Sequence, residues 1–226
     1  MTAPRPDTSD RGYFVVFEGV DKSGKTTQSK KLVENLKAEG WRVQWMRFPD
    51  YDDSDHTGPL IRRYLLSEVE LHPLEAHLVF CANRMGRMQR IKELLYSGVT
   101  VVCDRYVMSG IAYSMAKNIS ERWCKQIETS LVKPDLTVFT RLESSVAAQR
   151  ANFGVGDRHE KVAFLDKVVE MYEYLIDDRD AKVLVVPGTN TILDIEKAIT
   201  ERFASIAGAR LNRFTHELFD FYPEDE

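Results

Sequence analysis

The sequence predicts an α/β fold, a parallel sheet with helices on both faces, and three observations support this prediction. Short apolar runs alternate with helical patterns along all 226 residues, which is the order of βαβ units. The run at 99–103 is the most apolar of them, and such runs are typical of a buried parallel strand. A loop with two glycines at 19–26 joins the first strand pattern to the first helical pattern, as in strand–loop–helix motifs.

The first half of the chain has the pattern of two strands and three helices. Gly40 follows the first helical pattern, where a glycine commonly ends a helix. The expected elements are a strand at 14–17, a helix at 27–39, a strand at 42–48, a short helix at 60–66 and one long helix at 73–97. The long helix has one apolar face, made of Leu74, Leu78, Cys81, Met85, Met88, Ile91 and Leu95.

The second half continues the alternation with three more strands. The expected elements are strands at 99–103, 135–142 and 182–186, with helices at 106–117, 121–131, 144–151, 161–178 and 192–206. Residues 152–159 contain two glycines and mixed charge, which is typical of a mobile loop. We expect one domain at 12–226, a flexible segment at 1–11, a mobile lid at about 150–160, and a tail at 208–226 that packs on the body.

Composition excludes several classes of protein. The formal net charge is -4, which argues against wrapping of duplex nucleic acid. Residues 1–10 have no apolar core of a secretory signal, and no window reaches the roughly 18 apolar residues of a membrane span. Three cysteines, an odd number without C-x-x-C, favour buried thiols over disulfides or zinc. We therefore expect the cytoplasm as the compartment, with nuclear presence left open.

The loop from Gly19 to Thr26 matches G-x-x-x-x-G-K-[ST], the pattern of a P-loop. Glycines allow backbone N–H groups to surround a phosphate, and the following helix adds the positive end of its dipole. In this pattern Lys25 reaches the β- and γ-phosphates and the Thr26 hydroxyl holds Mg²⁺. The alternative is a glycine-rich turn with a chance lysine.

Charged residues follow the other strands, at the sheet edge where ligands bind in such folds. Asp104 has the position of a carboxylate that helps to hold Mg²⁺; it is also a candidate helix N-cap, and the two roles are compatible. Arg47 and Arg105 end two strands and are expected to clamp a charged acceptor, such as a monophosphate. The alternative is two solvated loop arginines.

Two further pairs of residues are candidates for contacts to a nucleotide. Phe80 and Arg84 lie four residues apart in the long helix, so a ring and a guanidinium there share one face and suit a base; the alternative is a rim aromatic and a surface arginine. Arg150 precedes the expected mobile loop and Arg158 lies within it; the loop either closes over phosphates or is an ordinary exposed loop. With Lys22, these cations suit phosphoryl transfer, which depends on positioning and charge neutralisation.

Taken together, these motifs resemble the thymidylate kinase family, in its eukaryotic branch. The resemblance covers about 12–207, and its Asp-Arg-Tyr and Arg-Phe-Pro motifs are weak alone but specific in combination. It rests on 17–28, on Arg47-Phe48-Pro49, on 78–84, on Asp104-Arg105-Tyr106 with Ser109-Gly110, on Lys133-Pro134-Asp135-Leu136, and on Phe153-Gly154.

The resemblance implies a P-loop kinase fold with a five-stranded parallel sheet, ATP as donor with Mg²⁺ as cofactor, a homodimer, and transfer of the γ-phosphoryl group to dTMP. It implies that Thr26 and Asp104 hold the metal and that Lys25, Lys22, Arg105, Arg158 and Asp21 are catalytic. The implied ATP-binding residues are Gly19, Ser23, Gly24, Lys25, Thr26, Thr27 and Arg150, the last beside the adenine.

The implied dTMP site has its own set of residues. Asp21 would contact the sugar 3′-hydroxyl, Arg47 and Arg105 the phosphate, while Phe80 would stack on thymine and Arg84 would hydrogen-bond it. The remaining implied contacts are Phe48, Ser109, Gly110, Tyr113 and Glu160, the last near the sugar.

The chain departs from this family pattern at three positions. Lys22 stands where an arginine is usual, and lysine keeps the charge but lacks the bidentate fork; Arg158 would then carry more of that role. His159 replaces a usual tyrosine, and Leu165 a polar residue.

Three alternative functions follow from the residues. The alternative nearest to a dTMP kinase is a kinase of another (deoxy)nucleoside monophosphate or of a deoxynucleoside. A GTPase switch needs an N-K-x-D segment, which is absent from the sequence. A catalytically silent nucleotide-binding subunit is opposed by the intact Lys25, Thr26 and Asp104.

Overall fold

The structure is a computed structural model that describes residues 11–52, 56–150 and 162–208. The expected N-terminal segment falls outside these ranges except for Arg11, whose guanidinium pairs with Asp135. The expected lid beyond Arg150 and the tail beyond Gly208 also lie outside the described residues.

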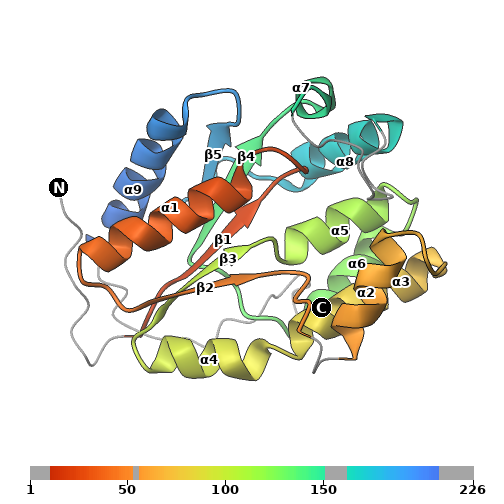
Figure 1. Ribbon diagram of the computed structural model, residues 1–226, viewed down its shortest axis with the longest axis horizontal. Helices are drawn as coiled ribbons and strands as arrows, with labels where there is room; N and C mark the ends of the chain where they lie inside the picture. Colours follow the sequence, from red (N-terminus) through yellow and green to blue (C-terminus); the bar gives the residue numbers. More distant parts are fainter. Residues whose placement is uncertain (1–10, 53–55, 151–161, 209–226) are drawn as a thin grey trace, which may run out of the picture.

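Five parallel strands form one sheet in the order β2-β3-β1-β4-β5 (Figure 1). The five-stranded parallel sheet expected from the sequence is therefore confirmed. The strands are β1 (Phe14–Glu18), β2 (Val43–Arg47), β3 (Thr100–Asp104), β4 (Leu136–Arg141) and β5 (Val183–Pro187). Every residue of the central strand β1 is buried, as expected for a parallel strand covered on both faces.

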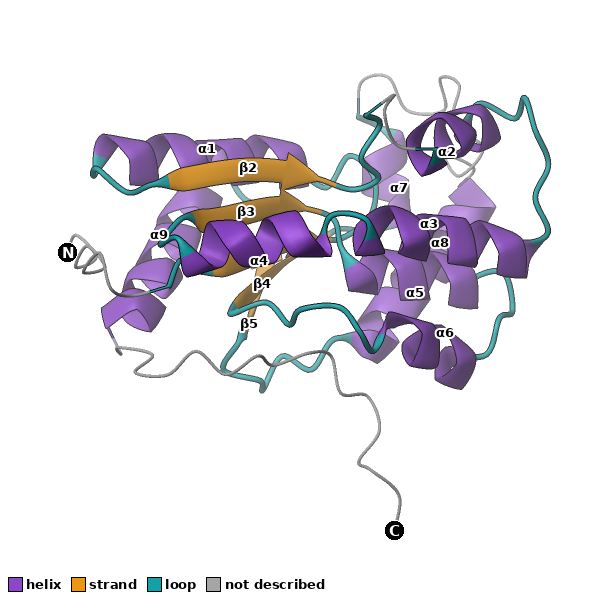
Figure 2. Ribbon diagram, turned by 90° about the horizontal axis from the view of Figure 1, so that it is seen from below, coloured by secondary structure: helices purple, strands orange, loops and turns teal. Residues whose placement is uncertain are grey.

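The helices of the described residues connect these strands and cover the sheet. They are α1 (Lys25–Ala38), α2 (Thr57–Leu65), α3 (Pro73–Met85), α4 (Met88–Tyr96), α5 (Val107–Met115), α6 (Glu121–Glu128), α7 (Ser144–Ala148), α8 (Val162–Leu175) and α9 (Ile192–Gly208). Figure 2 shows the strands pointing with their carboxyl ends towards the group that contains α2, α3 and α5. Within the described ranges, none of the helices combines the length and apolarity needed to cross a membrane.

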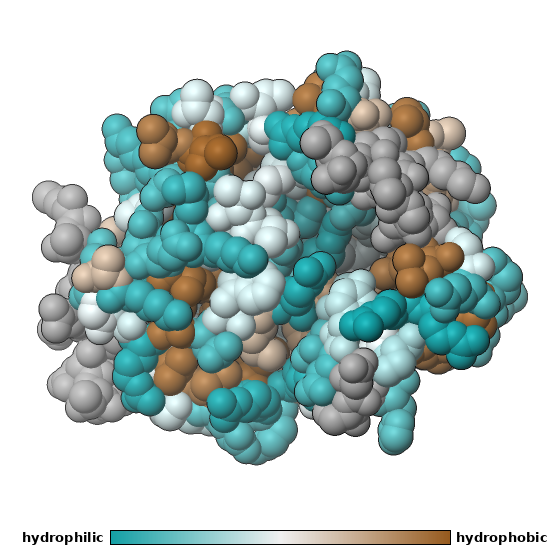
Figure 3. Space-filling view, viewed as in Figure 1, coloured by the Kyte–Doolittle hydropathy of each residue, from teal (hydrophilic) through white to brown (hydrophobic). Residues whose placement is uncertain are grey.

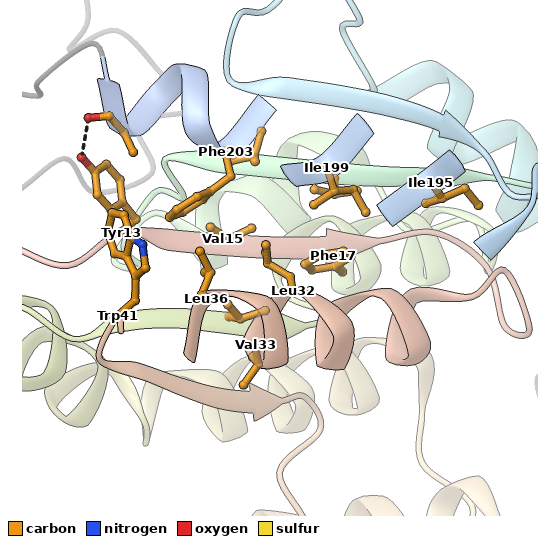
Figure 4. Packing of buried hydrophobic residues seen from close by; sticks show 14 of the residues in the cluster. Tyr13, Val15, Phe17, Leu32, Val33, Leu36, Trp41, Ile195, Ile199 and Phe203 are labelled. Carbon is orange, nitrogen blue, oxygen red and sulfur yellow. Dashed lines mark hydrogen bonds between the residues drawn. The ribbon is translucent and has the colours of Figure 1, made fainter. Parts of the chain in front are cut away.

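One hydrophobic core lies between the sheet and the helices α1 and α9 (Figure 4). Tyr13, Trp41 and Phe203 meet there edge to face, with ring centroids 5.3 to 6.0 Å apart, an arrangement that aromatic quadrupoles favour. The Tyr13 hydroxyl donates to the Ala207 carbonyl at 3.4 Å. These contacts fix α1, and with it the loop that precedes α1.

The opposite face of the sheet is covered by α4 and α5, and a further core packs around α8. The alternate residues of β1, Phe14 and Val16, join the cluster that contains Ile91 and Leu95 of α4. Tyr172 and Leu165 of α8 are fully buried against β4 and α5. Successive residues of β1 thus point alternately into the two cores, as the pleat of a strand requires.

The prediction of one long helix at 73–97 is wrong, because the chain forms α3 and α4 with a turn at 86–87. Gly86 ends α3, and the Arg87 side chain turns to Asp50, with 2.6 Å between Nε and Oδ2. The predicted apolar face is divided accordingly. Its α4 part is buried in the core, whereas Leu74, Leu78 and Met85 of α3 are each at least 40% exposed.

Candidate active site

The register of the sheet places three predicted site segments beside one another. Arg47 of β2 is paired with Asp104 of β3, and Asp104 is paired with Phe17 of β1. The loop from Gly19 onward follows β1 directly. The carboxyl ends of three adjacent strands therefore meet at the P-loop, as the topological rule for such sheets requires.

The two P-loop glycines meet different requirements. Gly19 has φ 137°, and a Cβ there would lie 2.6 Å from the Thr140 carbonyl oxygen, so only glycine fits. Gly24 has φ 102° and is the N-cap of α1, with open space where a Cβ would point. The first N–H groups of α1 have no partner within the helix, so they are available to an anion at this point.

Lys25 is the first residue of α1 and is 5% exposed. Its Nζ donates to the Val20 carbonyl at 2.5 Å. Burial, and then the charge of Arg105, lower the pKa of Lys25 to about 8, against the opposing influence of Asp21, Asp104 and Glu18. The site therefore holds a partly destabilised cation, which a bound polyphosphate would stabilise.

Thr26 and Asp104 form a hydroxyl–carboxylate pair, with 2.5 Å between Thr26 Oγ1 and Asp104 Oδ2. The second oxygen, Asp104 Oδ1, is buried and has no hydrogen-bond partner among the described residues. The part of the chain that the structure describes holds no group of three or more His, Cys, Asp or Glu side chains that suits a metal. One free carboxylate oxygen with a hydroxyl fits Mg²⁺, which keeps water and phosphate oxygens as its other ligands.

Glu18 is a site residue to which the sequence analysis assigned no role. Its buried carboxylate accepts the backbone N–H groups of Tyr106 at 2.9 Å and Ser109 at 3.2 Å, and the Ser109 hydroxyl at 2.5 Å. Burial raises the pKa of Glu18, while Ser109 and Arg105 oppose this shift. Glu18 therefore satisfies the start of α5, and Asp104, the candidate N-cap, instead faces Thr26. The only sequence signal for Glu18 was an acidic residue ending an apolar strand.

Arg105 lies in the turn between β3 and α5 with φ 69°. Its Nη1 donates to the Gly19 carbonyl at 3.1 Å and to Ser109 Oγ at 3.2 Å, and its Nη2 pairs with Asp21. A guanidinium has five N–H groups, so these contacts leave Nε–H and one Nη2–H, and the Tyr113 side chain also interacts with this guanidinium. The N–H groups that remain can bind an anion.

Asp21 joins Arg105 to Tyr113, whose hydroxyl donates to Asp21 Oδ2 at 2.8 Å. Burial would raise the pKa of Asp21, but the charges of Arg105 and Lys25 outweigh it and lower this pKa far below its ordinary value. Asp21 is therefore ionised and helps to orient the Arg105 guanidinium.

Two cavities meet at this cluster. One has a volume of about 140 Å³ and lies over α3 and α5, and the other has about 360 Å³ and lies over the P-loop. Asp21, Arg47 and Arg105 line both of them. Hydrophilic side chains surround the hollow on this face of the molecule (Figure 3). The shared residues therefore stand where a group bound in one cavity would approach a group bound in the other.

The smaller cavity contains the residues predicted for a base. Its walls include Phe48, Phe80, Arg84, Ser109, Gly110 and Tyr113. Phe80 packs edge to face on Tyr64 of α2, with ring centroids 6.4 Å apart. Arg84 is 2% exposed and pairs with Glu128 of α6, so the alternative of a surface arginine is wrong.

Arg47 is exposed and reaches both cavities. Its guanidinium lies 5.7 Å from the centroid of the Tyr51 ring, and that of Arg62 lies 5.3 Å from the same ring. Two cations on one aromatic ring raise the positive charge at the mouth of the smaller cavity.

The larger cavity contains most of the P-loop and Arg150. Its remaining walls are Lys22, Gly24, Lys25, Thr26, Thr27 and Asp104. Arg150 donates to the carbonyls of Lys22 and Gly188, each at 2.6 Å, and therefore braces the P-loop against the end of β5. Ser23 supports the loop from behind, with 2.6 Å between its Oγ and Thr140 Oγ1.

Four of the residues singled out from the sequence are not placed in this site. Arg158, His159 and Glu160 are outside the described residues. Leu165 lines neither cavity, because it is buried in the core around α8.

The fold and the site define a P-loop phosphotransferase with a second cavity beside its phosphate loop. A family model described as thymidylate kinase matches residues 17–199. The chain belongs to the thymidylate kinase family, which is a family of nucleoside monophosphate kinases.

Similar proteins have comparable length and are aligned over most of it. The thymidylate kinase of Homo sapiens is 40% identical, with 84% of this chain and 88% of that protein covered. The thymidylate kinase of Plasmodium falciparum is 37% identical, covering 88% and 93%. A solved structure of thymidylate kinase from Candida albicans superposes with a TM-score of 0.75 at 30% identity, covering 93% of this chain and 96% of that one.

Proposed function

We propose that this chain transfers the γ-phosphoryl group of ATP to dTMP, which yields dTDP and ADP. The observation that carries the proposal is the pair of cavities that share Asp21, Arg47 and Arg105. A P-loop cavity alone suits any nucleotide-binding protein. A second, base-sized cavity with guanidinium groups at the boundary suits a phosphorylated acceptor.

The larger cavity is the proposed ATP site. The N–H groups at the start of α1 and Lys25 would bind the phosphates, and Lys22 would add charge at the γ-phosphate. Arg150 would lie beside the adenine, and Thr27, Ser23 and Gly19 would complete the loop. Thr26 and Asp104 would hold Mg²⁺, which neutralises charge on the phosphate oxygens when bound.

The smaller cavity is the proposed dTMP site. Phe80 would stack on the thymine and Arg84 would donate to it, with Phe48, Ser109, Gly110 and Tyr113 around the nucleoside. Arg47 and Arg105 would bind the acceptor phosphate through guanidinium N–H groups. Asp21 would accept from the sugar 3′-hydroxyl while it keeps Arg105 in place.

In this arrangement catalysis consists of positioning and charge stabilisation. Arg105 would contact the phosphate of the acceptor, and Lys25 would contact the phosphates of the donor. Two cations that are already held in place would therefore stabilise the negative charge on the transferred phosphoryl group. Arg158 and Glu160 stay proposed members of the site, the first at the transferring phosphates and the second near the sugar.

An acceptor panel tests the proposal. Purified protein with ATP and Mg²⁺ is incubated with dTMP, dUMP, dGMP, dCMP and thymidine, and ADP release is followed by a coupled assay. We expect dTMP to give the highest kcat/KM, and EDTA to abolish turnover with every acceptor. Turnover of thymidine or another monophosphate with none of dTMP would exclude the proposed activity and leave one of the alternative kinases.

We also propose that the chain forms a homodimer through α3. Leu74, Leu78 and Met85 share one face of that helix at a helical spacing and are 40 to 45% exposed. Sedimentation velocity is expected to give twice the mass of one chain. Leu78→Glu should shift the protein to the monomer, whereas Leu193→Glu, a control on the exposed start of α9, should leave the mass unchanged; a monomeric wild-type protein would contradict the proposal.

We further propose a reducing compartment, the cytoplasm with or without the nucleus. The three cysteines are all free and buried, and burial raises the pKa of Cys81 and of Cys124 to about 12. These thiols are therefore packing groups and not disulfide partners.

A further inference from the structure

A buried ion pair lies behind the smaller cavity, and one of its two members, Glu128, has no role in the mechanism above. Arg84 of α3 lines the cavity, but its partner Glu128 is on α6 and does not. The Arg84 side chain is 3% exposed and that of Glu128 is 0% exposed. Burying two charges costs free energy that packing of apolar residues would not, so this pair calls for a functional explanation.

The pair is a two-point contact. Arg84 Nε donates to Glu128 Oε2 at 3.1 Å, and Arg84 Nη2 donates to Glu128 Oε1. A fork of this kind fixes both the position and the plane of the guanidinium. Gly110 of α5 makes room for it, because a Cβ there would lie 2.5 Å from Arg84 Nη2 and 2.9 Å from Glu128 Oε1.

The neighbouring histidine leaves Glu128 committed to Arg84. His77 Nδ1 lies 2.8 Å from Ser114 Oγ, and its Nε2 is 3.7 Å from Glu128 Oε1, which is too long for a hydrogen bond. Burial, and then the charge of Arg84, lower the pKa of His77 to about 4. His77 is therefore neutral at pH 7 and does not compete with Arg84 for the carboxylate.

The fork determines what Arg84 can offer to a ligand. Two of its five N–H groups bind Glu128, and the Cys81 thiol contacts the same guanidinium. Because Arg84 also lines the smaller cavity, its remaining N–H groups can serve a ligand there. A guanidinium cannot accept a hydrogen bond. The wall of the cavity at Arg84 is therefore a donor-only surface in a fixed plane.

We propose, on the basis of the function proposed above, that Glu128 is a positioning residue that sets base selectivity. By holding the plane of Arg84, it makes the cavity accept a base edge with a carbonyl oxygen and reject one with an exocyclic amine. The pyrimidines uracil and cytosine differ in this respect at position 4. An amine at position 4 would face the N–H groups of Arg84 and would leave these donors without an acceptor. Because Arg84 is held in one plane and cannot turn away, this mismatch would weaken binding of cytosine.

The test compares acceptors in wild-type protein, in Glu128→Gln and in Glu173→Gln. The control removes the same charge from the exposed fork of Arg141 and Glu173, whose two contacts are both 2.7 Å. For each protein, kcat and KM are measured with dTMP, dUMP and dCMP, and the Kd of each of these nucleotides is measured by calorimetry without ATP.

We expect Glu128→Gln to raise the KM and Kd of dTMP by about 10- to 100-fold, the value of a charge-assisted hydrogen bond, with kcat changed by less than about threefold. The ratio of kcat/KM for dUMP over dCMP should fall by about tenfold or more. Glu173→Gln should match the wild type in every quantity.

A merely structural Glu128 predicts a different result, namely a lower thermal stability with an equal loss for all three acceptors, and this result would overturn the proposal. If Glu128→Gln does not fold, Glu128→Asp serves instead, because it keeps the charge but shortens the arm that positions Arg84. It should lower the dUMP to dCMP ratio as well. A wild-type protein that binds dTMP without phosphorylating it would contradict the proposed function, and the Kd comparison would still decide the role of Glu128.

Discussion

Replacing Arg105 with alanine is expected to lower kcat/KM for dTMP by about three orders of magnitude without unfolding the protein, since arginines at transferring phosphoryl groups contribute on this scale. The guanidinium lies at the boundary of the two cavities and has N–H groups that Gly19, Ser109 and Asp21 do not use. Alanine adopts φ 69° at the same cost as arginine, so the backbone gains no new strain. Asp21, with 30% of its side chain exposed, can be rehydrated.

The comparison needs a control with an arginine at the same sheet edge. Arg141 ends β4 but pairs with Glu173 outside both cavities, so Arg141→Ala should retain nearly full activity. Arg105→Lys keeps the charge and loses the fork, and should fall between wild type and alanine. Near-normal turnover in a folded Arg105→Ala protein would place the acceptor phosphate elsewhere.

Replacing Lys25 with methionine is expected to lower kcat by at least about two orders of magnitude, because its Nζ is the cation nearest to the transferred group in a P-loop. Methionine retains most of the volume of the buried stem, so the packing of α1 should persist. Turnover is measured at saturating ATP and dTMP, with Lys37→Met in the exposed last turn of α1 as the control. A fully active Lys25→Met protein would exclude the P-loop as the ATP site.

The lowered pKa of Lys25 also predicts a pH dependence. Lys25 is charged below about pH 8 in the free protein and loses its proton as the pH rises through that value. A profile of kcat/KM for ATP reports the free enzyme, so it should fall above about pH 8. The profile of kcat should fall at higher pH, because bound phosphates raise the pKa of Lys25 again. Identical profiles for the two quantities would contradict this assignment.

The sheet and the P-loop could be predicted because their signals are local. An apolar run such as 99–103 indicates a buried strand by itself, and the spacing from Gly19 to Thr26 indicates a phosphate loop by itself. The break between α3 and α4 was missed because the apolar period continues across Gly86. At the break, Arg87 forms an ion pair with Asp50. These two residues lie 37 positions apart, so the local pattern cannot indicate that they pair.

The sequence by itself determined the succession of strands and helices along the chain and the position of the P-loop. It also determined that Arg47, Asp104 and Arg105 stand at strand ends. Each of these features depends on neighbours within a few residues. Only the tertiary structure decided which partners these side chains take. Glu18 caps α5 from β1, Asp21 holds Arg105, and Glu128 holds Arg84 from another helix. Buried charges must find partners wherever the fold brings them together, and this proximity is a property of the packed chain and not of its local pattern.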